Sequence, residues 1–341
     1  MYKIGKKWYT ISIEGIIKGV IIVIRMYKTD METNMTKETK EFEKGIWINM
    51  VAPTEDEIKL VCKKVKMQEE FIRYSLDYEE KARIDYEEED STTLFIIDVP
   101  IVEKESNEQV YSTMPLGLII VRDDYFITVS LKSNKIISEL ENNKMKSALI
   151  TYKKSRMILQ IFYKNAEMYL KYLKRINKET EIAENVLKTS QKNKELLKML
   201  SLEKSLVYFT TSLKANEVVM EKTLRGKIIK LYEEDEDILE DAIIENKQAI
   251  EMSKIYSDIL NGTMDAYASI ISNNLNGVMK FLTSITIILA IPTMIASYWG
   301  MNVQVPMQYV ESKWPFFIVV AISIILGIIA MIWLKRRDML D

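Results

Sequence analysis

The sequence contains no histidine and a single cysteine in 341 residues. The lack of histidine excludes imidazole metal sites, histidine-based catalytic triads and histidine pH switches. Cys62 alone cannot form an intrachain disulfide, and we expect it to be an ordinary reduced side chain in a helix. Metal chemistry in this chain must therefore use oxygen ligands, which suit hard cations such as Mg²⁺.

Proline and glycine are scarce, and none of the six prolines lies between residues 116 and 291. From about residue 132 to 280 the chain is dominated by Lys, Glu, Leu, Ile and Met, which favour helices. We expect successive helices at 155–176, 178–193 and 195–222, and then one long helix from about Asp235 to Trp299. Gly262 and Gly277 each cost this last helix about 1 kcal/mol.

The part before residue 130 is predicted to mix strands and helices. Stretches rich in β-branched and aromatic residues predict strands at 19–26, 45–51, 94–99, 116–121 and 125–130. Thr54 followed by Glu57 is a capping-box pattern, which predicts a helix over about 55–66. Lys18 interrupts the apolar stretch at 16–24, so a buried strand is a better interpretation there than a secretory signal.

The charges are balanced, with 47 Lys and Arg against 49 Asp and Glu. A balanced chain offers no basic surface for nucleic acid, so we expect no nucleic-acid partner. An acidic run covers residues 233–237 and is followed by Glu240 and Asp241. Such a run is usually a solvated face. The alternative is that it lies at a subunit interface, where a divalent cation would relieve its repulsion.

Two long runs without Asp, Glu, Lys or Arg lie near the C-terminus, at 281–310 and 314–334. Each is long enough to cross a bilayer as a helix. Lys280 precedes the first run and Lys335-Arg336-Arg337 follows the second, so the positive-inside rule places both termini in the cytoplasm. The expected divisions are a cytoplasmic α/β and helical domain (1–232), a stalk helix (233–280), a first transmembrane helix (281–301), an extracellular loop (302–313), a second transmembrane helix (314–334) and a basic cytoplasmic tail (335–341).

The first apolar run carries a stripe of small or hydroxylated residues at spacings of 4, 3 and 4: Thr286, Ala290, Thr293 and Ser297. Two helices cannot enclose a hydrated ion, so a pore would need several copies around an axis, with this stripe facing it. The simpler alternative is that small residues only let two helices approach closely.

The tripeptide Gly300-Met301-Asn302 lies in the later part of the first run, after the stripe. Gly300 is expected to let the helix end and turn, because glycine tolerates the backbone angles found at helix C-termini. A ring of Asn302 amides could hydrogen-bond the first-shell waters of Mg²⁺ without removing them. This predicts an ion pathway, with the tripeptide at its outer mouth.

The long helix also carries a second pattern upstream of the membrane. Apolar and small residues there alternate spacings of 4 and 3, as in a helix that packs lengthwise against copies of itself. The residues of this seam are Met252, Tyr256, Ile259, Thr263, Ala266 and Ile270. The alternative is a long helix that packs only on its own domain.

These features resemble the CorA magnesium transporter family, the two-transmembrane Gly-Met-Asn metal ion transporters. The resemblance rests on residues 273–283 (NNLNGVMKFLT), on Ile291-Pro292-Thr293 and on residues 298–302 (YWGMN). It implies an α+β membrane protein assembled as a ring, a homopentamer in a lipid bilayer, with a cytoplasmic α/β funnel domain, a long stalk helix and a two-helix transmembrane hairpin. The selectivity filter would be Gly300, Met301 and Asn302, and the pore-lining positions would be Asn276, Met279, Leu282, Thr286, Ala290, Thr293 and Ser297. Trp299 departs from the family, which commonly has Tyr there.

The resemblance also implies a regulatory Mg²⁺ bound between neighbouring cytoplasmic domains. Its stalk ligand would be Asp241, and two further acids would be Asp258 and Asp265. The partner acid falls on Tyr74, which is not a carboxylate, so Glu69, Glu70 or Asp77 would have to replace it.

We therefore predict a channel-like transporter of hydrated Mg²⁺ in the cell membrane, with Co²⁺ and Ni²⁺ as further candidates, driven by the electrochemical gradient and gated by intracellular Mg²⁺. We expect no enzyme, because the sequence has no nucleophile elbow, cofactor loop or Walker motif. One alternative is a Zn²⁺ transporter of the same superfamily, which tends to have Gly-Val-Asn. Another, from a different class, is a membrane-anchored coiled-coil scaffold.

Overall fold

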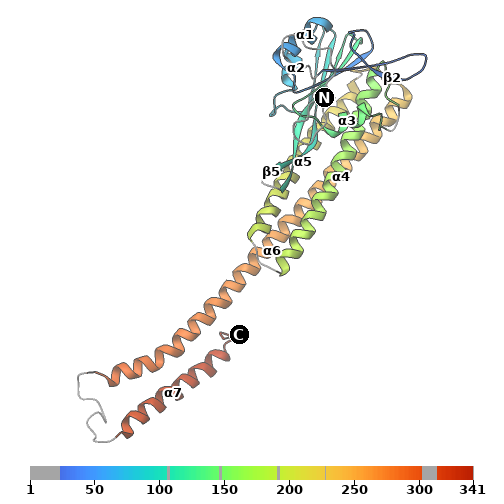
Figure 1. Cartoon of the computed structure of the whole chain (residues 1–341). Coiled ribbons are helices and arrows are strands. Elements are labelled where there is room, and N and C mark those ends of the chain that lie inside the picture. Colours follow the sequence, from blue (N-terminus) through green and yellow to red (C-terminus); the bar gives the residue numbers. More distant parts are fainter. Residues whose placement is uncertain are drawn as a thin grey trace. The chain divides into compact units, whose positions relative to one another are not determined.

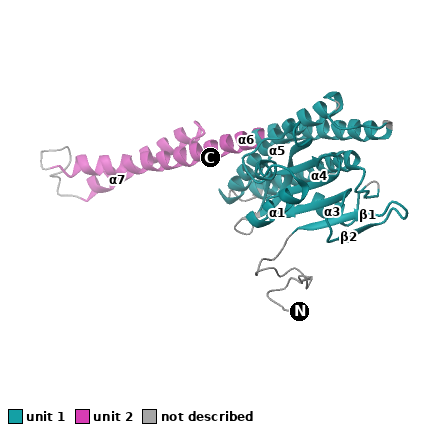
Figure 2. Ribbon diagram, turned by 90° about the horizontal axis from the view of Figure 1, so that it is seen from above, with its two compact units in different colours: residues 1–261 teal, residues 262–341 magenta. Residues whose placement is uncertain are grey.

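The computed structural model describes residues 24–105, 108–145, 148–189, 193–226, 228–301 and 313–340. The chain divides into two compact units, Met1–Asn261 and Gly262–Asp341 (Figure 2). The predicted strand at 19–26 lies mostly outside the described residues, which begin at Ile24. Asn302 and most of the predicted loop at 302–313 also lie outside them.

The first unit contains a sheet and most of the helices (Figure 1). The strands are β1 (Arg25–Thr29), β2 (Thr36–Thr39), β3 (Ile46–Val51), β4 (Arg83–Glu87), β5 (Thr92–Glu105), β6 (Glu108–Val121) and β7 (Tyr125–Ser130). The helices are α1 (Glu55–Val65), α2 (Glu70–Tyr74), α3 (Lys135–Glu141), α4 (Lys154–Thr189), α5 (Asn193–Gly226) and the first part of α6 (Glu233–Trp299).

The strands form one sheet in the order β2-β1-β3-β7-β6-β5-β4. Neighbouring strands are antiparallel except β3 and β7, which pair in parallel with Trp47 opposite Phe126. The two faces of the sheet are covered by different helices. Ile58 and Val61 of α1 and Phe71 of α2 join the core on one face. On the other, Phe95 of β5 meets Phe162 of α4 with ring centroids 6.2 Å apart, and Tyr111 of β6 meets Phe209 of α5 at 6.5 Å.

The helix predicted at 55–66 is confirmed. The Thr54 side chain accepts a hydrogen bond from the Glu57 backbone N–H, and the Glu57 carboxylate accepts one from the Thr54 N–H at 2.7 Å. Cys62 lies buried on this helix, and burial raises the pKa of its thiol to about 12. The thiol is therefore protonated at neutral pH, as expected for an unreactive cysteine.

Strands β5 and β6 form a hairpin of 14 residues each, which is longer than the predicted stretches 94–99 and 116–121. Both strands run through a proline, Pro100 and Pro115, where the prediction stopped. Pro115 lies opposite Asp98 and has no N–H to donate to it. The Asn216 side chain supplies the missing donor, because its Nδ2 donates to the Asp98 carbonyl at 2.8 Å. Its Oδ1 also accepts a hydrogen bond from the Asp98 N–H at 2.8 Å.

The predicted break between helices 155–176 and 178–193 is wrong, because α4 is continuous over Lys154–Thr189. The polar residues at the expected break lie on the helix surface, where Asn177 Nδ2 donates to Glu181 Oε1 one turn later at 2.7 Å. Helix α5 covers the third predicted helix with a few additional residues at each end.

The long last helix is confirmed as α6, which has Pro292 in its interior. In the first unit α6 packs on α5: Asn246 Nδ2 donates to the Leu213 carbonyl at 2.9 Å and Ser253 Oγ to the Leu206 carbonyl at 3.1 Å. The second unit contains the remainder of α6 and α7 (Trp314–Lys335). Within the described residues, these are the two helices long and apolar enough to cross a membrane.

Candidate functional site

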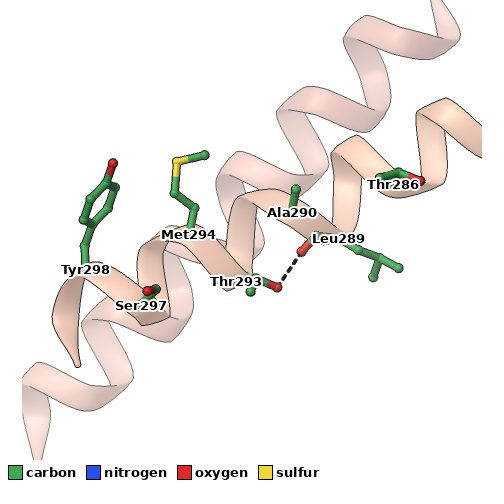
Figure 3. A pocket seen from close by; sticks show the side chains of 7 residues that line it. All are labelled: Thr286, Leu289, Ala290, Thr293, Met294, Ser297 and Tyr298. Atoms are coloured by element: carbon green, nitrogen blue, oxygen red, sulfur yellow. Dashed lines mark hydrogen bonds between the residues drawn. The ribbon is translucent and has the colours of Figure 1, made fainter. Parts of the chain in front are cut away.

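The stripe predicted from the sequence forms an exposed face of α6. Thr286, Ala290, Thr293 and Ser297 are all exposed in the chain, and they line an open groove together with Leu289, Met294 and Tyr298 (Figure 3). The groove is lined by residues of α6 only. This face is therefore free to meet another molecule or water.

The opposite face of α6 is covered. Its buried and half-buried residues follow a helical spacing and are Ser284, Ile285, Ile288, Ile291, Pro292, Ile295 and Trp299. On α7 the least exposed positions include Ser323 and Gly327, a pair of small residues four apart that lets helices approach closely. The small residues of α7 thus serve helix packing, whereas the stripe on α6 remains uncovered. In this chain the stripe is not explained by packing between α6 and α7.

Two hydroxyls on the exposed face hydrogen-bond to their own helix. Thr286 Oγ1 donates to the Leu282 carbonyl and Thr293 Oγ1 to the Leu289 carbonyl, each at 2.9 Å (Figure 3 shows the second). Because the donor hydrogen is used by the backbone, each oxygen presents its lone pairs outward. Toward the first unit the same helical spacing continues through Leu282, Met279 and Asn276, all exposed.

Gly300 directly follows the last residue of α6. Its N–H donates to the Ala296 carbonyl at 3.0 Å, and Met301, which follows, is 46% exposed. The expected reason for glycine here is wrong, because Gly300 does not adopt a left-handed backbone angle. A Cβ at this position would instead lie 3.2 Å from the Ala296 carbonyl oxygen. Gly300 is therefore favoured by close approach to the preceding turn. Asn302 is outside the described residues.

Part of the acidic run is used for ion pairing within the chain. Arg156 of α4 contacts Asp235 at 2.7 Å through Nε and Glu234 at 2.7 Å through Nη2. Asp235 is only 2% exposed. The interpretation of this run as a solvated face thus fails for Asp235, which anchors the start of α6 to α4.

The other predicted acidic ligands lie on exposed positions of α6. Asp241, Asp258 and Asp265 are exposed, and the described residues contain no group of three or more Asp, Glu, Cys or His that could hold a metal within one chain. Among the candidate partner residues, Glu69 contacts Arg73 at 3.0 Å, and Tyr74 lies under the Arg83 guanidinium at 4.9 Å from the ring centroid. A cation at Asp241 would thus find no group of three such side chains among the described residues of one chain.

The predicted seam is only partly buried by the chain itself. Ile259 is 52% exposed and Ile270 is 47% exposed. The α6 residues that pack on α5, including Asn246 and Ser253, are different ones. The seam stays a prediction for contacts between copies.

One contact near this site was not predicted from the sequence. Ser284 is fully buried, and its Oγ donates to the Met339 carbonyl at 2.9 Å. After α7 the chain turns at Asp338, which has φ of 52°, and the Met339 N–H returns to the Leu334 carbonyl at 3.2 Å. The segment around Met339 is thereby held against α6 at Ser284, two residues after Leu282. A single serine in an apolar run gives no signal for such a contact.

The fold and these two helices define an integral membrane protein with a sheet-containing soluble domain and a C-terminal pair of apolar helices. Residues 42–336 match the family described as CorA-like Mg²⁺ transporter protein, and the chain belongs to this family. The resemblance stated from the Gly-Met-Asn region is thus confirmed.

Individual relatives agree with this assignment. The cobalt/magnesium transport protein CorA of Methanocaldococcus jannaschii is 27% identical over 93% of this chain and 98% of its own length. The protein of the same description from Thermotoga maritima is 32% identical over 40% of this chain and 42% of its own length. Among solved structures, the complete CorA magnesium transporter of M. jannaschii superposes with a TM-score of 0.77 at 24% identity, covering 93% of this chain and 98% of that one. The full-length CmaX protein has a TM-score of 0.65 at 12% identity, covering 93% of this chain and 97% of that one. Both structures are below 25% identity to this chain and support the fold alone.

Proposed function

We propose that this chain is a channel-like transporter that carries hydrated Mg²⁺ across the cell membrane, with Co²⁺ and Ni²⁺ as further cargo. Family membership supports the proposal, as do relatives described as cobalt/magnesium transport proteins. The observation that carries it is the uncovered face of α6, where Thr286, Ala290, Thr293 and Ser297 are exposed along an apolar helix. Polar groups on a membrane helix are expected to face other helices or a water-filled path rather than lipid.

The chemistry of this face suits an ion that keeps its water. Mg²⁺ loses its first-shell waters reluctantly, so its path must offer acceptors to those waters rather than ligands to the metal. The hydroxyl oxygens of Thr286 and Thr293 are such acceptors. The run from 281 to 310 contains no carboxylate that could hold the ion tightly. Binding would therefore be weak enough for release, as conduction requires.

The conduit would form only in an assembly. One copy offers two apolar helices, and a hydrated ion needs a ring of helices around it. In the proposed homopentamer, α6 of each copy lines the axis and α7 lies outside it. Asn302 of each copy, directly after Gly300-Met301, would place a ring of amides at the outer mouth. Met279 and Leu282 would form an apolar constriction that closes by dewetting.

The proposed orientation places both termini in the cytoplasm and the 302–313 loop outside. The membrane potential would then drive uptake, since a divalent ion gains on the order of 4.6 kcal/mol at −100 mV. No nucleotide hydrolysis is required for a flow in this direction.

Closure by internal Mg²⁺ would use Asp241, Asp258 and Asp265, which are exposed on α6. An Asp241→Lys variant would replace the charge of the bound cation. We expect it to resist proteolysis without Mg²⁺, whereas the parent protein should need Mg²⁺ for the same protection. Equal Mg²⁺ dependence in the two proteins would remove Asp241 from the regulatory site.

The transport proposal is tested by Mg²⁺ uptake into liposomes that contain the purified protein. We expect uptake by the parent protein and a loss of at least about tenfold in Asn302→Ala, because a ring loses every amide at once. A membrane-anchored scaffold would pass no Mg²⁺ in either form. Uptake of Zn²⁺ but not Mg²⁺ would favour the zinc-transporting alternative.

A further inference from the structure

Trp299 is the departure from the family's usual Tyr, and its indole N–H is unsatisfied. The Nε1 atom is buried and has no hydrogen-bond partner. An indole N–H can only donate, so it needs an acceptor from outside the described protein groups. A buried donor left unpaired is destabilising, so an acceptor that reached it would be bound favourably.

A pocket of about 330 Å³ lies beside this indole, between α6 and α7. Its walls are almost entirely apolar and are Pro292, Ala296, Trp299, Gly300, Phe316, Val319, Val320, Ser323 and Ile324. The one hydroxyl among them is already used, because Ser323 Oγ donates to the Val319 carbonyl at 2.9 Å. The pocket thus offers an apolar volume beside an indole whose buried N–H has no partner among the described groups.

The position of the pocket along the helices indicates what could fill it. It extends from the end of α6 at Trp299 and Gly300 inward to Pro292, about eight residues or roughly 12 Å along the helix. At the outer end of a transmembrane helix, Trp lies at the level of the lipid head groups. An acyl chain would fit along the apolar walls, with its ester carbonyl near Trp299.

We infer that this pocket binds one acyl chain of a phospholipid, with the ester carbonyl accepting the Trp299 N–H. Since Nε1 is enclosed, the indole must turn toward the pocket to meet the carbonyl, and the unsatisfied donor favours that turn. A tyrosine hydroxyl projects from the far end of its ring and would not place a donor at the same point. The tryptophan of this chain therefore gives the site a preference for ester-linked lipids.

The test compares a diester phosphatidylcholine with its diether analogue, which has the same chains and no carbonyl. The purified full-length protein in detergent is titrated with each lipid, and the shift in thermal unfolding gives an apparent Kd. We expect the parent protein to bind the ester lipid roughly fivefold more tightly than the ether lipid, the effect of one neutral hydrogen bond. In Trp299→Phe, which keeps a ring without a donor, the ratio should fall to about one.

Two further variants make the result specific. Trp333→Phe removes an exposed indole near the other end of α7 and should leave the ester preference unchanged. Val320→Trp fills the pocket from α7 and should weaken both lipids alike, and it keeps the inference testable if Trp299→Phe does not fold. Equal binding of the two lipids by the parent protein would overturn the inference, as would an ester preference that survives in Trp299→Phe. Neither readout involves ion flux, so failure here is distinct from failure of the transport proposal.

Discussion

The Arg156 guanidinium of α4 and the Asp235 carboxylate at the start of α6 meet at 2.7 Å, and Asp235 is 2% exposed. Helix α6 thus begins at a fixed point on the soluble domain before it continues toward the membrane. Replacing Arg156 by Met would leave Asp235 buried without its cation. We expect a loss of about 2–3 kcal/mol in the free energy of unfolding, measured by denaturant titration.

A matched control for this pair is Glu234→Gln. Glu234 contacts the same guanidinium at 2.7 Å but its side chain is 81% exposed. Exposed ion pairs are worth little, so this variant should be close to the parent protein in stability. Equal losses in the two variants would show that Asp235 is not the anchor.

Gly117 of β6 is predicted to tolerate no side chain. A Cβ there would lie 1.9 Å from Ser75 Oγ and 2.5 Å from Ser75 Cβ, and Ser75 is fully buried next to α2. Gly117→Ala should therefore destabilise the soluble domain by about 1–3 kcal/mol. Gly262→Ala is the contrasting change, since a Cβ there meets nothing within 4 Å in this chain. It should raise stability by about 1 kcal/mol by improving the helix. Thermal unfolding in detergent measures both, and a stable Gly117→Ala would contradict the packing at α2.

Asp98 predicts a pH dependence of stability. Burial raises the pKa of its carboxyl above the ordinary value, although a hydrogen bond from Ser212 opposes the shift. The folded chain therefore holds this proton more tightly than the unfolded chain does. The stabilising contribution is complete below the unfolded pKa and is lost as the pH rises through the folded pKa. Asp98→Asn should be more stable than the parent protein at pH 7, and this advantage should shrink toward pH 4. A pH-independent difference in unfolding temperature would show that the charge of Asp98 is not the cause.

The exposed face of α6 makes a prediction about bulk. In a ring with this face at the axis, Ala290→Phe would place a large apolar side chain from every copy into the path. We expect Mg²⁺ flux into liposomes to fall by at least about tenfold. Ile329→Phe introduces the same aromatic side chain at a position on α7 that is 55% exposed, and it should leave the flux nearly unchanged. A similar loss in both variants would indicate general damage rather than a blocked path.

The elements set by local patterns could be predicted from the sequence, and those set by distant contacts could not. The Thr54–Glu57 capping box and the two uncharged runs gave helices close to the observed bounds. Strands β5 and β6 were predicted too short because proline normally ends a central strand. Pro115 is tolerated because Asn216, more than 100 residues away, satisfies the backbone of Asp98. The break predicted between 176 and 178 is absent, and Asn177 lies on the surface of the continuous helix α4.

In the candidate site too, local spacing could be predicted from the sequence and distant contacts could not. The spacing of Thr286, Ala290, Thr293 and Ser297 placed them on one face, and the structure leaves this face uncovered. The sequence could not show that Asp235 is occupied by Arg156 or that Ser284 holds the Met339 carbonyl, because both contacts depend on how distant segments pack. The packing of neighbouring copies around the proposed axis is also set by the assembly, so one sequence could not predict it.

The most direct test of a water-filled path along α6 is the reactivity of cysteines placed on it. The background is Cys62→Ser, which removes a buried thiol. Ser297→Cys is then treated from outside with a membrane-impermeant cationic methanethiosulfonate while Mg²⁺ flux into liposomes is recorded at low internal Mg²⁺, with Ile329→Cys as the control. We predict that Ser297→Cys reacts and that its flux stops, while Ile329→Cys keeps its flux. An unreactive Ser297→Cys, or a labelled one that still conducts, would contradict the account.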